Sequence, residues 1–232
     1  PLPIEPIEKG MPELCKGVKY DGNKAAVEAI MTTDTCPKEV AVEFEISGRK
    51  CVMGGMLKGS GMIHPNMATT LSFITTDAAI APEYLQRALS DTVKTTLNMV
   101  SVDGDQSTND MCCVMANGMA GNAEIKGENK DFEAFKNALY VIMMNLARMM
   151  ARDGEGATKL IECVCSGADD FLTAKTVAKS VIMSSLFKAA IFGEDANWGR
   201  ILCAVGYADA EFDINSVDVD LASSAGTVAV CR

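Results

Sequence analysis

A glycine-rich polar loop in the first third of the chain leads directly into an apolar run. Residues 58–69 read Lys-Gly-Ser-Gly-Met-Ile-His-Pro-Asn-Met-Ala-Thr. Self-cleavage of a peptide bond requires a hydroxyl at the cut, a small preceding residue that leaves the carbonyl open, and a flexible backbone that permits a bend. Thr69 supplies the hydroxyl and Ala68 the small residue, while Gly59 and Gly61 supply the flexibility. The loop therefore predicts cleavage between Ala68 and Thr69.

The same threonine would become a nucleophile with its own base. The hydroxyl of Thr69 would attack the carbonyl of Ala68, and water would open the resulting ester. The α-amine exposed by the cut has a reference pKa of about 7.7–8.0, so it is partly neutral near pH 7 and lies on the nucleophilic residue itself. Taken alone, however, an Ala-Thr pair is also a common start for a β-strand.

Three further segments carry recognisable patterns in the same chain order. They are Ser101-Val-Asp-Gly-Asp-Gln-Ser-Thr-Asn-Asp110 with Ala116-Asn-Gly118, then Asp153-Gly-Glu-Gly-Ala-Thr-Lys159, and then Ile191-Phe-Gly-Glu-Asp-Ala-Asn-Trp-Gly-Arg-Ile201. Together with the cleavage loop, the chain resembles the ornithine acetyltransferases, the glutamate N-acetyltransferase family of arginine biosynthesis. The resemblance implies transfer of acetyl from N2-acetyl-L-ornithine to L-glutamate through an acetyl-threonine at Thr69, releasing ornithine, and leaves acetyl-CoA open as a second donor.

The resemblance also implies which residues bind substrate. Besides Thr69, they are Thr35 in Thr-Asp-Thr, Lys58 for a substrate carboxylate, and Glu155 for a substrate ammonium. From the sequence alone, Thr35 reads equally as a turn residue, Lys58 as a solvated lysine and Glu155 as a loop glutamate. The family's oxyanion-hole Thr-Gly pair would lie upstream of Pro1, so we expect a piece of a longer protein, truncated at both ends.

Other candidate sites are weaker. The segment from Asp103 to Asp110 lacks the glycine and closing glutamate of an EF-hand, so we expect a turn whose own side chains satisfy it. His64 is the only histidine and beside Pro65 it indicates local structure. We expect no metal and no cofactor. Nine cysteines without zinc or disulfide spacing indicate reduced thiols in the core.

The composition restricts the class of protein. With 48% hydrophobic and 22% charged residues, the chain is typical of a globular protein. Its net charge of −10 disfavours binding to the phosphate backbone of a nucleic acid. No apolar run reaches the roughly 18 residues of a membrane span, and no leader is visible. We expect a cytoplasmic location, or the mitochondrial matrix in a eukaryote, and partners that are small substrates without nucleic acid or membrane.

Hydrophobic periodicity predicts the elements that hold these residues. Alternation in Val40–Ile46 and a turn at Ser47-Gly48 predict a hairpin, and Asp131 is expected to cap a long helix. The expected strands are 40–46, 50–53, 71–76, 160–164 and 201–207, with a further strand at the C-terminal end, and the expected helices are 22–31, 82–97, 131–149 and 173–189. Clustered strands with long helices favour an α+β fold. The resemblance implies a layered sandwich of β-sheets flanked by helices, superficially like the N-terminal-nucleophile hydrolases.

Cleavage would divide one catalytic unit into two chains. Residues 1–68 would be the C-terminal part of the α chain and residues 69–232 the N-terminal part of the β chain. We expect these chains to stay associated and to form a higher oligomer. Two alternatives remain open: an aminopeptidase or amidase of the related N-terminal-nucleophile hydrolases, with water as the acceptor, and an inactive fragment that lacks the upstream oxyanion donors.

Overall fold

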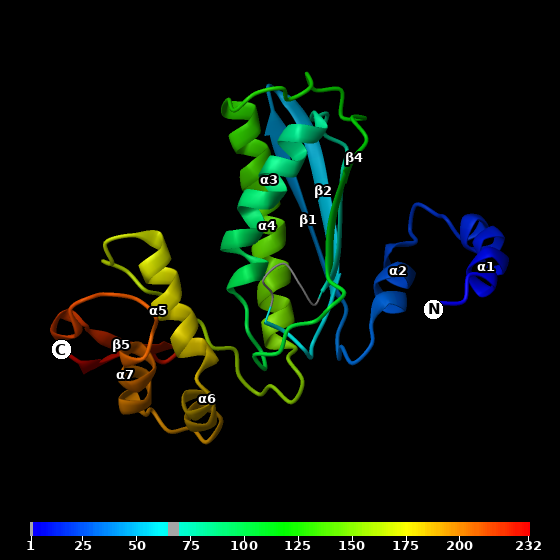
Figure 1. Cartoon of the computed structure of the whole chain (residues 1–232). Helices are drawn as coiled ribbons and strands as arrows, with labels where there is room; N and C mark the ends of the chain where they lie inside the picture. Colours follow the sequence, from blue (N-terminus) through cyan, green and yellow to red (C-terminus); the bar gives the residue numbers. More distant parts are fainter. Residues whose placement is uncertain (1, 65–69) are drawn as a thin grey trace.

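A four-stranded sheet forms the centre of the computed structural model, which describes residues 2–64 and 70–232 (Figure 1). The strand order is β1-β2-β3-β4; the first two pairings are antiparallel, and β3 runs parallel to β4. The strands are β1 (Lys38–Ile46), β2 (Arg49–Lys58), β3 (Leu71–Thr76) and β4 (Met111–Ala116). This confirms the predicted hairpin and the strand that follows the cleavage loop.

The hairpin turn has the chemistry that its geometry requires. Ser47 and Gly48 both have positive φ angles, 47° and 78°, which a two-residue turn between twisted strands favours. Val40, Val42 and Phe44 then alternate with exposed glutamates along β1, and the apolar residues pack against the core. The period-2 pattern in the sequence therefore corresponds to one face of β1 that packs against the core and one face that is exposed to solvent.

Two helices cover the inner face of the sheet. They are α3 (Pro82–Thr95), which with the short η1 (Leu97–Met99) connects β3 to β4, and α4 (Lys130–Arg152). Helix α4 packs on β1, β2 and α3, and its Phe135, Leu139, Ile142 and Leu146 are fully buried. Position 55 must be glycine, because an added Cβ would lie 2.8 Å from Cγ2 of Ile142.

The start of α4 corrects one expectation. Asn129, and not Asp131, is the N-cap, and its side chain accepts hydrogen bonds from the backbone N–H groups of Asp131 and Phe132 at 3.0 Å each. The carboxylate of Asp131 instead accepts from the backbone N–H of Ser47 at 3.1 Å and from its hydroxyl at 2.5 Å. Asn and Asp side chains can both cap a helix. Here Ser47 of the hairpin turn binds the carboxylate of Asp131, and Asn129 is the cap.

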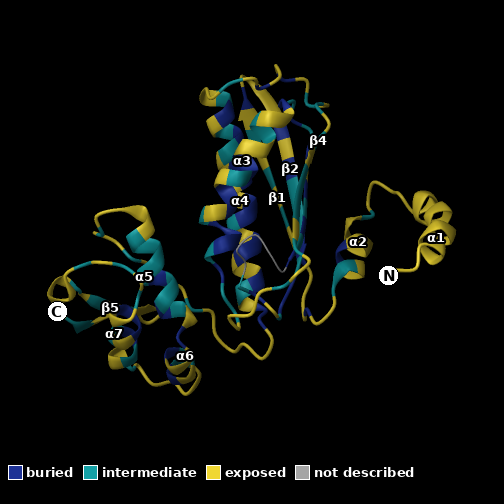
Figure 2. Ribbon diagram, viewed as in Figure 1, coloured by how far each residue is buried: buried dark blue, intermediate teal, exposed yellow. Residues whose placement is uncertain are grey.

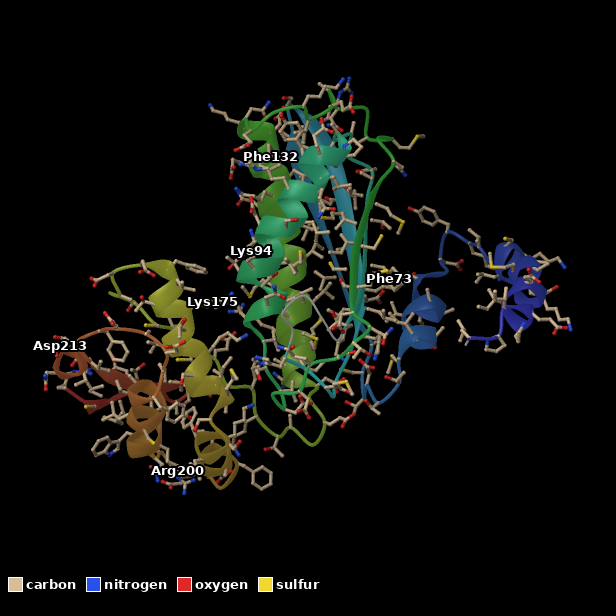
Figure 3. All side chains as sticks on the ribbon, viewed as in Figure 1. Phe73, Lys94, Phe132, Lys175, Arg200 and Asp213 are labelled. Atoms are coloured by element: carbon tan, nitrogen blue, oxygen red, sulfur yellow. The ribbon has the colours of Figure 1, made fainter. Side chains whose placement is uncertain are left out.

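The C-terminal residues form a smaller group with its own apolar cluster. Its elements are α5 (Phe171–Met183), α6 (Ser185–Phe192), α7 (Trp198–Gly206), η2 (Ile214–Ser216), and a hairpin of β5 (Val219–Ser223) and β6 (Gly226–Cys231). The strand expected near the C-terminal end is confirmed as β6. In Figure 3, Lys175 of this group faces Lys94 of α3, and its ammonium donates to the carbonyl oxygen of Lys94 at 3.3 Å.

Three predictions in this region are wrong in whole or in part. Residues 201–206 are helical and Tyr207 is the C-cap, because Asn197 caps the start of α7 and Ile201, Ala204 and Val205 turn toward one side and are buried. Residues 160–164 alternate between exposed and half-buried, but no described residue pairs with them as a strand. The helix expected at 173–189 is two helices, since Ser184 has an extended backbone and caps α6.

The N-terminal residues lie on the other side of the sheet from α4 (Figure 1). Helix α2 (Asn23–Ile30) matches the predicted helix and buries Val27 beside β2. Helix α1 (Glu5–Lys16) was not predicted, and Figure 2 shows it exposed along its whole length, with no buried residue. The second face of the sheet also stays open in the described part of the chain, where Val52, Met111 and Met115 are 41–50% exposed.

The described residues therefore make a mixed α+β fold, as expected. All nine cysteines are described, and none of them is in a disulfide. The expectation that they lie in the core holds fully only for Cys51, because Cys15, Cys36 and Cys203 are exposed. In the described part of the chain, no helix has both the length and the apolar composition that crossing a bilayer requires.

Candidate functional site

The loop that follows β2 is where distant segments of the chain meet. The backbone N–H of Gly59 donates to Oδ1 of Asp34 at 2.7 Å, and the hydroxyls of Ser60 and Thr33 share a hydrogen bond of 2.7 Å. From the other side, the backbone N–H of Glu155 donates to the carbonyl oxygen of Ser60 at 2.9 Å. The Thr-Asp-Thr segment and the loop at the end of α4 are thus both fixed to the glycine loop.

A buried ionic cluster lies beneath this junction. The ammonium of Lys38 is 2.7 Å from Oδ1 of Asp34 and 2.5 Å from Oδ2 of Asp153, and the three side chains are 0%, 1% and 6% exposed. Burial raises the pKa of both carboxyls, but hydrogen bonds outweigh it and leave both pKa values below the usual range. Asp34 accepts from Gly59 and Lys38, and Asp153 from Lys38 and Thr35. Both carboxylates therefore stay charged around the lysine.

Thr35 is attached to this cluster by both of its donors. Its backbone N–H lies 3.0 Å from Oδ2 of Asp153, and its hydroxyl donates to Oδ1 of the same carboxylate. The residue itself is exposed. Because the hydroxyl proton is used internally, the oxygen can only accept from a substrate, which suits an ammonium or amine donor.

Glu155 lies against the glycine loop. An ideal Cβ on Gly61 would be 2.5 Å from Oε1 of Glu155, so the carboxylate occupies space that only a glycine leaves free. Glu155 is exposed to solvent in the described residues. Its carboxylate therefore lies against Gly61 on one side and is accessible to solvent on the other.

Lys58 and Asp110 form a pair of opposite charges at the edge of the sheet. Lys58 ends β2 opposite Leu71 of β3, and Asp110 directly precedes β4. Both carboxylate oxygens of Asp110 are buried without a hydrogen-bond partner among the described residues. Burial raises the pKa of Asp110 to about 6, although the positive charge of Lys58 lowers it. Three of the predicted substrate-binding residues, Thr35, Lys58 and Glu155, thus surround one short loop.

The predicted nucleophile and the residue before it, Thr69 and Ala68, lie outside the described residues. Their described neighbours are close to Lys58 along the chain and in space. Thr70 is buried, its carbonyl accepts from the backbone N–H of Met111 at 2.8 Å, and its Cγ2 would be 3.4 Å from a Cβ on Gly59.

Asp103 binds the backbone of the glycine loop at Met62 and Ile63. This corrects the expectation that the side chains of the turn from Asp103 to Asp110 would form hydrogen bonds only within that turn. The carboxylate of Asp103 accepts from the backbone N–H of Asp105 at 3.0 Å, as expected, but also from Met62 at 2.6 Å and Ile63 at 2.9 Å. Met62 has a φ of 59°, a conformation that costs a non-glycine residue about 1–3 kcal/mol and persists only where neighbours enforce it. The loop before the predicted cut is therefore held in a bent shape.

His64 has a local role, as expected. Its Nδ1 is 3.2 Å from the hydroxyl oxygen of Ser101. Burial lowers its pKa, and so do the charges of Lys179 and Lys188. A neutral ring at neutral pH follows, hydrogen-bonded within the protein.

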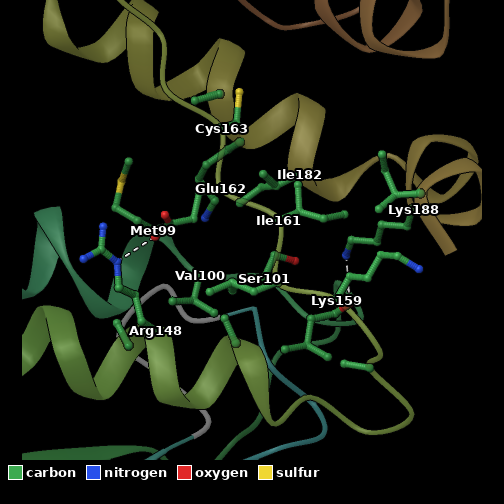
Figure 4. A pocket seen from close by; sticks show the side chains of 18 of the residues that line it. Met99, Val100, Ser101, Arg148, Lys159, Ile161, Glu162, Cys163, Ile182 and Lys188 are labelled. Atoms are coloured by element: carbon green, nitrogen blue, oxygen red, sulfur yellow. Dashed lines mark hydrogen bonds and ion pairs between the residues drawn. The ribbon is translucent and has the colours of Figure 1, made fainter. Parts of the chain in front are cut away.

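A cavity of about 740 Å³ opens beside this site, between α4, residues 156–164 and helices α5 and α6 (Figure 4). Ser101 and Glu155 line it together with Lys188, whose ammonium donates to the carbonyl oxygen of Val102 at 2.7 Å. In the described part of the chain, no group of three or more His, Cys, Asp or Glu side chains could hold a metal ion. The arrangement offers carboxylates, ammonium groups and hydroxyls, the groups that recognise an amino acid.

Sequence reasoning missed the residues that join these segments: Asp34, Lys38 and Asp153. Asp34 and Lys38 are separated by four residues, but Lys38 begins a strand, so helical spacing gives no signal. Lys38 and Asp153 are 115 residues apart in the chain. The Thr-Asp-Thr motif that contains Asp34 and the motif that begins at Asp153 both pointed to this region, but neither pointed to these side chains.

Comparisons with known proteins agree along the whole chain. The ArgJ family model matches residues 1–232. The chain is 51% identical over 232 residues to the arginine biosynthesis bifunctional protein ArgJ 1 of Clostridium acetobutylicum, and 51% identical over the same length to ArgJ of Caldanaerobacter subterraneus. A crystal structure of arginine biosynthesis bifunctional protein ArgJ from Bacillus halodurans matches with a TM-score of 0.61 at 49% identity, covering 63% of this chain and 68% of that one.

The relatives are longer than this chain. All of its residues align to the Clostridium and Caldanaerobacter proteins, yet it spans only 57% and 58% of their lengths.

Proposed function

The chain belongs to the ArgJ family along its whole length, and on that basis we propose that the protein containing it moves acetyl from N2-acetyl-L-ornithine to L-glutamate. The observation that carries this proposal is the meeting of Thr35, Lys58 and Glu155 around Gly59–Gly61, directly before the predicted cleavage site. A zwitterionic substrate needs both signs of charge, and this loop has Lys58 on one side and Glu155 on the other. Acetyl-CoA is a second candidate donor for the same nucleophile.

The reaction has two halves that share one nucleophile. The hydroxyl of Thr69 attacks the acetyl carbonyl of N2-acetylornithine, the C–N bond breaks, and the amine of ornithine leaves with a proton. The α-amine of Thr69 acts as the base that takes the hydroxyl proton and returns it to the leaving amine. The amine of glutamate then attacks the acetyl ester, which restores the threonine hydroxyl and yields N-acetylglutamate.

The binding residues hold the two charged ends of the amino acid. Lys58 pairs with its α-carboxylate, and Glu155 binds an ammonium group. Thr35 accepts a hydrogen bond from a substrate N–H, because its own proton is directed to Asp153. Binding both ends places the reacting nitrogen.

Cleavage between Ala68 and Thr69 would leave one sheet built from two chains. Residues 1–68 would contain β1 and β2, and residues 69–232 would contain β3 and β4. The pairing of β2 with β3, from Met53–Thr76 to Lys58–Leu71, crosses the predicted cut. This ladder supports two chains that remain associated, and a division of 1–68 and 69–232 that separates chains but not folding units.

We propose also that a second sheet layer covers the open face of the four-stranded sheet, as the layered sandwich implied by the family resemblance requires. The exposed Val52, Met111 and Met115 on that face support this arrangement. A cytoplasmic location is the corresponding proposal for the cell, since the relatives compared are bacterial proteins.

Intact-mass analysis of the full-length protein tests the proposal. We expect two polypeptides that begin and end at the Ala68–Thr69 bond. Incubation with N2-acetylornithine alone should add one acetyl group to the polypeptide that starts at Thr69, and glutamate should remove it as N-acetylglutamate. Loss of the acetyl group to water as acetate, with glutamate present, would instead indicate a hydrolase.

A further inference from the structure

Three segments that the proposed function uses are connected through one buried ammonium. Asp34 holds the backbone N–H of Gly59, next to Lys58, at 2.7 Å. Asp153 holds the backbone N–H of Thr35 at 3.0 Å and lies two residues before Glu155. The ammonium of Lys38 bridges these two carboxylates at 2.7 and 2.5 Å.

Among the described residues, Asp34 and Asp153 form ion pairs with no cation other than Lys38. Two carboxylates that share one buried ammonium repel each other when it is absent, and each would then remain buried without a counter-charge. The side chains of Lys38, Asp34 and Asp153 are 0%, 1% and 6% exposed, so the cluster is shielded from solvent that could otherwise solvate the two carboxylates. Direct hydrogen bonds also join these segments, from Thr33 to Ser60 and from Glu155 to Ser60. Lys38 adds the counter-charge that lets Asp34 and Asp153 stay ionised side by side while they hold the backbone of Gly59 and Thr35.

We propose that Lys38 is a positioning residue for the acetyl-transfer site: with Asp34 and Asp153, it fixes the separation of Thr35, Lys58 and Glu155 and thereby sets the affinity for the amino acid. The assignment of those three as substrate contacts rests on the proposed function. The mechanical part, that Lys38 holds Asp34 and Asp153 in the positions from which they bind the backbone of Gly59 and Thr35, does not.

The test compares three variants of the full-length protein. Lys38→Met removes the bridge and leaves two buried charges, so it should lower thermal stability strongly. The triple variant Lys38→Met, Asp34→Asn, Asp153→Asn removes all three charges but keeps side-chain oxygens that accept from Gly59 and Thr35, so it should fold. Leu139→Ala, in the buried face of α4 and outside the cluster, is the control for lost stability alone.

The expected result separates positioning from stability. In the triple variant, the KM for glutamate should rise at least about tenfold while kcat changes less, since uniform binding and not the chemical step is lost. Hydrogen exchange at the backbone amides of Thr35 and Gly59 should accelerate by a similar factor. Leu139→Ala should lower the melting temperature with KM near that of the unmodified protein. A triple variant with restored stability, unchanged KM and unchanged exchange at Thr35 and Gly59 would overturn the proposal.

Different results would contradict the proposed function and the positioning role of Lys38. A full-length unmodified protein that transfers no acetyl would contradict the proposed function. The exchange rates at Thr35 and Gly59 in the triple variant would still decide whether Lys38 has this positioning role.

Discussion

The carboxylate of Glu155 occupies the space that a side chain at position 61 would need. An ideal Cβ on Gly61 would lie 2.5 Å from Oε1 and 2.8 Å from Oε2 of Glu155, far inside normal contact. The backbone N–H of Glu155 donates to the carbonyl oxygen of the neighbouring Ser60 at 2.9 Å. Backbone and side chain of Glu155 are thus both fitted to the glycine loop, and this relationship can be tested.

Gly61→Ala should displace the carboxylate of Glu155 at little cost in stability. A flexible side-chain end can move away, so we expect the free energy of unfolding to change by less than about 1 kcal/mol. The KM for glutamate should rise about tenfold or more, because a displaced carboxylate no longer meets the substrate ammonium. Steady-state kinetics and urea unfolding provide the measurements. Gly127→Ala is the matched control, since nothing lies within 4 Å of a Cβ there, and it should leave KM unchanged.

Glu155→Gln should weaken amino-acid binding while the fold survives. Loss of a buried charge pair with the substrate costs on the order of 2–5 kcal/mol of binding free energy, whereas a surface-loop change costs less than about 0.5 kcal/mol of stability. Kinetics and thermal melts of the full-length protein would show both. Glu194→Gln is the control, because Glu194 is another exposed glutamate, paired with Lys159, and it should leave the kinetics unchanged. An unchanged KM and kcat in Glu155→Gln would return this residue to the role of a solvated loop glutamate.

Thr69→Ala should abolish both cleavage and transfer, whereas Thr70→Ala should retain some of each. The two hydroxyls are adjacent, but only one of them can be exposed at a new N-terminus. Thr70 is buried at the start of β3, so its substitution should lower stability by about 1 kcal/mol. Gel analysis, N-terminal sequencing and acetyl transfer assays would distinguish the two. If Thr70→Ala is the variant that stays uncut, the cleavage register is wrong by one residue.

Asp110 should make the protein less stable at neutral than at acid pH. Its folded pKa of about 6 lies above the ordinary aspartate value of 3.8, so between these pH values the folded state holds a proton that the unfolded state has released. Stability therefore falls as pH rises from about 4 to 6, by on the order of 1–3 kcal/mol, and stays lower above that range. Asp110→Asn should remove this contribution to the slope and stabilise the protein at pH 7. Urea unfolding across this pH range, with Asp105→Asn as the control, would check it; identical slopes in both variants would contradict the assignment.

Local periodicity was enough to predict the central elements of this fold. The alternation of Val40, Val42 and Phe44, the turn at Ser47-Gly48 and the stripe of α4 are each written in consecutive residues, so they need no distant partner. The motifs were also enough to indicate a chain of the ArgJ family. The resemblance that they carry implied Thr35, Lys58 and Glu155 as substrate contacts, and that assignment stays a prediction. These three signals are local, and the structure preserves their proximity to the glycine loop.

Only the tertiary structure decided the features that depend on distant contacts. Residues 201–207 form a short apolar run whose period is ambiguous, and packing of Ile201 and Val205 in the small C-terminal cluster makes it a helix. Asn129 caps α4 because the hairpin turn engages Asp131. The charge of Lys38 is placed between Asp34 and Asp153 by segments that are 115 residues apart. A buried ion pair is formed by whichever side chains the completed fold brings together. For that reason the sequence determined which reactive and charged residues the loop carries, while the fold determined which distant side chains hold them in position.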